Sequence, residues 1–136
     1  MKIFAAIANA GSVKMFFEKT GIKLNYLISY FYLDGQAHKI TNEYRKMIKS
    51  LFLDSGAYSA EAGNIKISVA EYRTYLKLYG SLFEEYFNLD DNFDDPELNQ
   101  WNQEFIEKEL PSSRRPIPVV HDNEDPFSEF RLYVDQ

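Results

Sequence analysis

Residues 51–59 read Leu-Phe-Leu-Asp-Ser-Gly-Ala-Tyr-Ser, a short apolar run that leads into an acid, small residues and an aromatic ring. A run of this kind is typical of a buried parallel strand whose carboxyl end opens into a tight turn. In α/β folds such as the (β/α) barrel, catalytic residues lie at these strand ends. We therefore expect Asp54 to be placed for chemistry.

The composition predicts one folded domain over residues 1–136. The chain is 45% hydrophobic and 16% aromatic, which is enough to form a packed core. It has no cysteine, so a disulfide framework and a thiolate metal site are excluded. The apolar residues 1–8 are too few for a signal peptide or a membrane span, so we expect a cytoplasmic protein with no membrane partner.

The net charge of −6 is unevenly distributed along the chain. Residues 1–83 carry 11 basic and 6 acidic side chains, whereas residues 84–136 carry 4 basic and 15 acidic ones. The second part alone would repel a phosphate backbone. The simplest interpretation of its acidic residues is a solvated face on the later helices.

Apolar runs alternate with amphipathic segments along the chain. Ser68 followed by Glu71 is typical of a capping box, and Asp95-Pro96 is typical of a helix start. Residues 59–64 are small or polar and are expected to form a loop. We expect strands over residues 2–8, 26–33, 50–53, 86–89 and 117–120, and helices over 12–19, 41–49, 68–78, 96 to about 108, and from 126 onward.

Apolar strands that alternate with helices predict an α/β fold with about five parallel βα units. Such units build either an open doubly wound sheet or a (β/α) TIM-type barrel. No glycine-rich phosphate-binding motif follows any strand, which favours the barrel. Because a full barrel takes roughly 200 residues or more, we expect a partial one. An unclosed barrel exposes its edges, so a truncated piece, closure by association and an open sheet all stay possible.

Three of the expected strands end in polar side chains that can share a ligand. Asp54 follows the third strand, Asp90 and Asp91 the fourth, and His121 the fifth. Because the carboxyl ends of parallel strands meet at one edge, we expect these side chains to converge. Tyr58, four residues beyond Asp54, is suited to stack on a planar ligand.

Each of these residues also has a purely structural interpretation. Asp54 can be a turn residue that hydrogen-bonds its own backbone, Tyr58 can be core, and His121 can be an ordinary loop residue. The acidic residues from Asp91 to Asp95 are expected to form a solvated loop with a helix cap, although carboxylates can also bind Mg²⁺ or Ca²⁺. Their spacing is not that of an EF-hand, and we expect no metal.

The segment from Leu53 to Ser59 resembles the Asp-Ser-Gly-Gly-Phe/Tyr-Gln motif of tRNA-guanine transglycosylases. It is closer to the Asp-Ser-Gly-Ala-Phe/Tyr-Ser form of phage and bacterial relatives that act in 7-deazaguanine modification of DNA. Those enzymes are (β/α)₈ barrels that exchange guanine for a deazaguanine base. The resemblance runs from the first to the fifth expected strand, and it implies the N-terminal part of such a barrel, working without a cofactor.

The resemblance also implies a role for each site residue. Asp54 resembles the acid that contacts the base and transfers a proton, while Ser55 and Gly56 resemble residues that line the pocket. Tyr58 resembles the aromatic that stacks on the base. Asp90 resembles the carboxylate that accepts the N1–H and amino group of guanine, and His121 stands where the tRNA enzymes have a base-reading glutamine.

Two departures from the family pattern leave alternatives open. Ala57 and Ser59 replace a glycine and a glutamine of the tRNA-type motif, so DNA, tRNA and a free base are all candidate substrates. The family's aspartate nucleophile and cysteine-rich zinc site have no counterpart in residues 1–136, so the resemblance does not by itself make this chain an enzyme. One alternative is a non-catalytic truncated or split module that needs a second chain to complete the barrel. Another is a metal-dependent hydrolase that uses Asp54, Asp90 and His121 as ligands.

Overall fold

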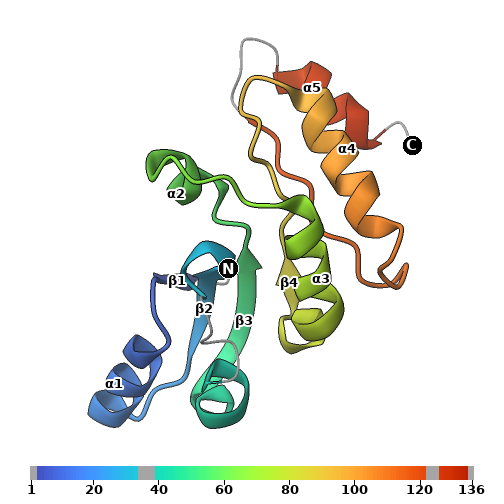
Figure 1. Ribbon diagram of the computed structural model, residues 1–136. Coiled ribbons are helices and arrows are strands. Elements are labelled where there is room, and N and C mark those ends of the chain that lie inside the picture. Colours follow the sequence, from blue (N-terminus) through green and yellow to red (C-terminus); the bar gives the residue numbers. More distant parts are fainter. Residues whose placement is uncertain (1–2, 34–38, 122–125, 135–136) are drawn as a thin grey trace.

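A four-stranded, all-parallel sheet organises the molecule, as Figure 1 shows. The computed structural model describes residues 3–33, 39–121 and 126–134. The strands lie in the order β1-β2-β3-β4, so each pairs with its neighbour in sequence. The α/β class and the parallel strands are thus confirmed. The strands are β1 (Phe4–Ile7), β2 (Leu24–Ser29), β3 (Ile48–Asp54) and β4 (Glu85–Tyr86).

The sheet is open, because β1 and β4 lie at opposite ends of the strand order. The predicted fifth strand over 117–120 is wrong, because only an isolated bridge between Phe87 and Ile117 forms there. Ile117 donates its N–H to Tyr86 and accepts the N–H of Asn88, both at 2.8 Å. The residues that flank Ile117, Pro116 and Pro118, have no N–H to extend the pairing on the outer side.

Helix ends follow the local signals in the sequence. Helix α1 (Gly11–Thr20) ends where Gly21 adopts a φ of 69°, and α3 (Val69–Tyr79) begins where the Ser68 hydroxyl accepts the N–H of Glu71. Helix α4 (Pro96–Glu107) begins where the Asp95 carboxylate accepts the N–H of Leu98 at 3.0 Å. The last helix is α5 (Pro126–Val134), which begins where the sequence predicts a helix from residue 126 onward.

Two segments differ from the sequence prediction. The predicted loop over 59–64 is only partly correct, because residues 59–62 belong to α2 (Ala57–Ala62) and only Gly63 and Asn64 form a turn. The predicted helix over 41–49 is replaced by short turns, Lys39–Glu43 of π type and Arg45–Met47 of 3₁₀ type, before β3 begins at Ile48. Pairing of β3 with β2 and burial of Ile48 at its start outweigh the helical spacing of this segment.

The two faces of the sheet are packed differently. Leu51 and Leu53 of β3 are buried in a core that also contains Tyr72 of α3 and Ile106 of α4. Phe52 lies between the two leucines and so points to the opposite face. There its ring lies 4.3 Å from that of Phe4 and 6.4 Å from that of Phe87, and all three phenylalanines are only partly buried. We call these three residues the aromatic row.

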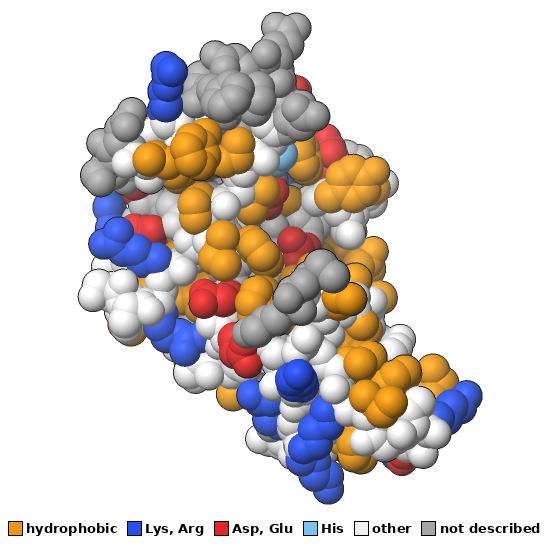
Figure 2. Space-filling model, turned by 180° about the vertical axis from the view of Figure 1, so that it is seen from behind, with side chains coloured by type: hydrophobic (Ala, Val, Ile, Leu, Met, Phe, Trp, Pro, Cys, Tyr) orange, Lys and Arg blue, Asp and Glu red, His pale blue; other side chains and the backbone are white. Residues whose placement is uncertain are grey.

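Several exposed basic side chains lie on α1 and near the start of β3, away from the carboxyl ends of the strands. Lys14 and Lys19 on α1 and Lys46 and Lys49 near the start of β3 are exposed. In Figure 2, Lys and Arg side chains lie at the lower end and along the left edge of the view, while hydrophobic side chains are spread over its middle. Within the described part of the chain, every helix is too short or too polar to cross a membrane.

Candidate functional site

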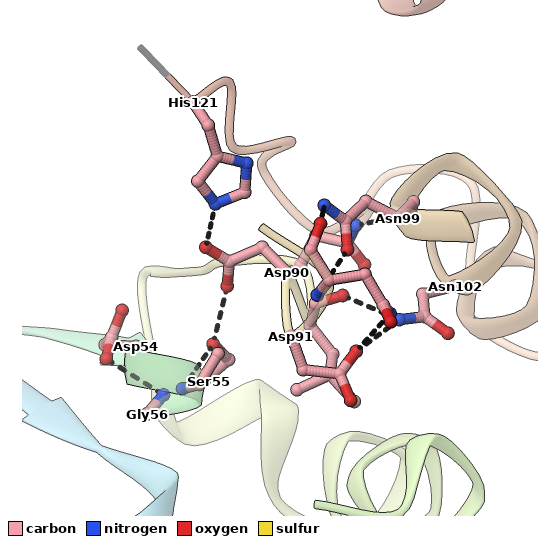
Figure 3. Close-up of polar contacts among 12 residues, drawn as sticks. Asp54, Ser55, Gly56, Asp90, Asp91, Asn99, Asn102 and His121 are labelled. Atoms are coloured by element: carbon pink, nitrogen blue, oxygen red, sulfur yellow. Dashed lines mark hydrogen bonds and ion pairs between the residues drawn. The ribbon is translucent and has the colours of Figure 1, made fainter. Parts of the chain in front are cut away.

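Asp90 is the centre of a polar cluster at the carboxyl ends of the strands (Figure 3). The hydroxyl of Ser55, which follows β3, donates to Asp90 Oδ1 at 2.9 Å. His121 Nε2 lies 3.2 Å from Asp90 Oδ2. The Asp90 and His121 side chains are only 14% and 15% exposed. The structure therefore brings together residues from three segments that are distant in the sequence.

Asp54 ends β3 beside this cluster and has an unusual electrostatic environment. Burial, and to a lesser extent the charge of Asp90, raise the pKa of its carboxyl above the ordinary value. The backbone N–H groups of Gly56 and Ser55 act in the opposite direction, and Gly56 donates to Asp54 Oδ2 at 2.9 Å. Asp54 thus makes the local backbone bond of a turn residue and also lies near a second carboxylate.

Gly56 makes the turn after β3 possible. Its φ of 82° lies in the left-handed region, which side chains with a Cβ disfavour. A Cβ at this position would lie 2.3 Å from the Ser29 hydroxyl and 2.5 Å from Phe31 Cβ, so no other residue fits. The Ser55 hydroxyl also accepts the N–H of Ala57 at 3.3 Å, at the start of α2. This turn holds Asp54 and Ser55 at the end of the sheet.

Tyr58 is not part of the core. It lies in the first turn of α2 with 76% of its surface exposed. An exposed ring at the start of this helix is available to a ligand or a partner. Its stacking on a base stays a prediction.

Asp91 is not the solvated residue that the sequence suggested. Its Oδ1 accepts the side-chain amides of Asn92 at 2.8 Å and of Asn102 at 3.0 Å. Asn102 and Asn99 of α4 are 4% and 0% exposed. These asparagines are not among the site residues that the sequence predicts. The signal that could have revealed them is polar amides at positions 99, 102 and 103, on what would otherwise be the apolar face of α4.

Two cavities lie next to the cluster, on the side of Asp91. One, of about 240 Å³, is lined by Ala57, Ala60 and Asp91 among others. The other, of about 390 Å³, lies between residues 66–69 and α4 and is lined by Trp101 and Asp91 among others. Neither lining includes Asp54, Asp90 or His121. These two cavities therefore do not provide a pocket for the predicted site residues.

The metal-dependent hydrolase receives no support from the arrangement of side chains. Over residues 3–33, 39–121 and 126–134, no group of three or more His, Asp or Glu side chains is placed to hold a metal ion. Asp54, Asp90 and His121 all belong to the described residues and do not form such a group. What the arrangement offers is a carboxylate held from two sides, with a second carboxyl of raised pKa beside it.

Comparisons with known proteins do not assign this chain to a family. No protein-family model matches the sequence, no curated protein matches it significantly, and no solved structure matches its fold significantly.

Proposed function

We propose that the protein binds the base of guanine or a 7-deazaguanine and belongs to a transglycosylase-like base-exchange system. The observation that carries this proposal is the position of Asp90, which lies between Ser55 and His121 and next to Asp54 at the ends of parallel strands. The motif at residues 53–59 points to the same chemistry. DNA, tRNA and the free base are candidate substrates.

Asp90 is the base-reading residue in this proposal. Guanine presents two adjacent donors, N1–H and the 2-amino group, and a carboxylate presents two acceptor oxygens that match them. Each carboxylate oxygen can accept more than one hydrogen bond. Ser55 and His121 can therefore hold the Asp90 carboxylate in place while the base binds to it.

Asp54 is the proton-transfer residue, and Tyr58 provides the stacking surface. A leaving base needs a proton and an incoming base must lose one, and a carboxyl with a raised pKa is better suited to carry it at neutral pH. We assign no nucleophile among residues 1–136, so the proposal covers base binding and proton transfer.

We further propose that the sheet is the first part of a (β/α) barrel. The strand order β1-β2-β3-β4, continued by the bridge to Ile117, is the order in which a barrel would be built. Supporting this, the side chains placed at the carboxyl ends of β3 and β4 include the two acids of the candidate site.

Calorimetric binding of guanine and of 7-cyano-7-deazaguanine tests the proposed function. We expect Asp90→Asn to weaken binding by about 1.5–3 kcal/mol, because one charged acceptor becomes a donor. Asp94→Asn is the matched control, since it removes the same charge from an exposed residue of the same loop. Adenine, which lacks both guanine donors, should bind weakly to the wild type. Equal affinities for Asp90→Asn and wild type would remove Asp90 from the site.

A second candidate is a non-catalytic module that requires another chain. It is favoured by the open sheet and by the partly exposed aromatic row. In this case the base site is retained, and the remaining strands are supplied by association. Stability would then depend on protein concentration.

A further inference from the structure

Helix α4 turns a pair of buried amides toward the loop that carries Asp90. Asn99 and Asn102 are almost fully buried, at 0% and 4% exposure. A buried amide is costly unless its hydrogen bonds are satisfied. Both side chains form hydrogen bonds with the segment 89–92, which contains Asp90 and the residues on either side of it.

Asn99 holds the backbone beyond Asp90. Its side-chain nitrogen donates to the Asn92 carbonyl at 2.8 Å, and its side-chain oxygen accepts the Asn92 N–H at 3.2 Å. This paired contact resembles the bonding between two strands, and it fixes the backbone of Asn92 through both its N–H and its carbonyl. The side chain of Asn88 adds a bond from before Asp90, to the Asn99 carbonyl at 2.9 Å.

Asn102 holds both neighbours of Asp90. Its side-chain nitrogen donates to the Leu89 carbonyl at 2.9 Å and to Asp91 Oδ1 at 3.0 Å. Figure 3 shows the result: the Asp91 side chain points toward Asn102, while the Asp90 side chain points the other way, toward Ser55 and His121. The contacts to the residues before and after Asp90 fix the backbone from which its carboxylate projects.

We propose that Asn99 and Asn102 are positioning residues, which aim the Asp90 carboxylate at the ligand by clamping the loop on both sides of it. This inference rests on the proposed function, in which Asp90 reads the base. Ser55 and His121 contact the carboxylate itself, but they leave the backbone of the loop free. The hydrogen bonds from Asn99 and Asn102 fix this backbone. Such fixing matters because misplacement of a binding group by about 1 Å is enough to impair a site.

The test compares Asn102→Ala with Gln103→Ala. Gln103 is also a buried amide of α4, at 7% exposure, but its side chain donates to Pro116 and Glu107 and not to the Asp90 loop. Both variants lose buried hydrogen bonds and are expected to unfold at lower temperature than the wild type. Only Asn102→Ala should also change the site.

The first measurement is selectivity, taken well below the melting temperature of each variant. Hypoxanthine lacks the 2-amino group of guanine, so the affinity ratio of the two bases reports how well Asp90 is aimed. We expect Asn102→Ala to lose about tenfold in guanine affinity and to lower this ratio, while Gln103→Ala keeps both close to wild type. If both variants keep the wild-type ratio, the clamp has only a structural role and the proposal is overturned.

The second measurement needs no ligand. The Asp90 charge contributes to the raised pKa of Asp54, so carboxyl NMR of Asp54 reports whether Asp90 stays in place. We expect the pKa of Asp54 to fall in Asn102→Ala and not in Gln103→Ala. If the wild type binds no guanine but this pKa change occurs, the proposed function fails and the clamp stands. An unchanged pKa in a folded Asn102→Ala overturns the clamp.

A milder variant keeps the test decisive if Asn102→Ala does not fold. Asp91→Ala removes the side-chain acceptor that the Asn102 and Asn92 amides share, and it leaves the bond of Asn102 to the Leu89 carbonyl. The proposal predicts a smaller change in the same direction, both in base selectivity and in the pKa of Asp54. A folded Asp91→Ala protein that matches the wild type in both measurements contradicts the proposal.

Discussion

The environment of Asp54 disfavours its charged carboxylate, and the stability of the fold therefore depends on pH through this residue. Its pKa in the folded protein is raised by burial and by the charge of Asp90. The folded state therefore binds the Asp54 proton more tightly than the unfolded state does. The contribution of this group to the free energy of unfolding must fall as pH rises from the unfolded pKa through the folded pKa, and it stays low above that window.

Replacement of Asp54 by asparagine should remove this cost. The side-chain oxygen of Asn can still accept the N–H of Gly56, so the turn is expected to survive. We expect Asp54→Asn to be more stable than the wild type at neutral pH, with the difference vanishing below the unfolded pKa of the acid. Urea unfolding of both proteins across this pH range checks the prediction. A variant that is less stable at every pH would show that the carboxylate has a structural role that Asn cannot fill.

At the scale of the element, α4 carries the clamp and depends on its cap. Asp95 accepts the N–H of Leu98, and Pro96 begins the helix. We expect Asp95→Ala to lower the free energy of unfolding by about 0.5–2 kcal/mol, because a helix N–H loses its partner. The change is measured by urea unfolding, with Asp94→Ala as the control that removes a neighbouring charge but no cap. Equal losses in the two variants would contradict the role of Asp95.

The elements that the sequence predicts well are those with local signals. The caps at Ser68 and Asp95 depend on a few adjacent residues, and both were predicted. The failures have a tertiary cause. Pairing and burial start β3 at Ile48, and the chain at Ile117 makes only one bridge to its neighbour.

The candidate site, too, could be predicted from the sequence only in part. The meeting of Asp90 with Ser55 and His121 could be anticipated, because parallel strands bring their carboxyl ends to one edge. The clamp from Asn99 and Asn102 could not, because it depends on which face of α4 packs on which loop. A sequence pattern gives the spacing of these amides but not their partners.

At the scale of the whole molecule, the sheet face that carries the aromatic row can be tested as a surface for self-association. Ala6 is exposed and points to the same face as Phe4, two residues before it, and pairs in register with Leu27. If this face binds a second copy, light scattering should show a mass that rises with concentration, and Ala6→Glu should abolish the rise without lowering the melting temperature at high dilution. Ala70→Glu, at an exposed position of α3, is the control. A wild type that stays monomeric at all concentrations rules out self-association through this face.

The two edges of the sheet differ in how readily they accept another strand. On the outer side of Ile117, Pro116 and Pro118 offer no hydrogen-bond donor, and the Pro116 carbonyl is already taken by Gln103. An added strand would find few hydrogen-bond partners on this side, which disfavours fibril formation through this edge. Addition of a strand is therefore less favourable here than at the β1 edge, and a second chain that completes a barrel would have to pair on this side without a donor from Pro116 or Pro118.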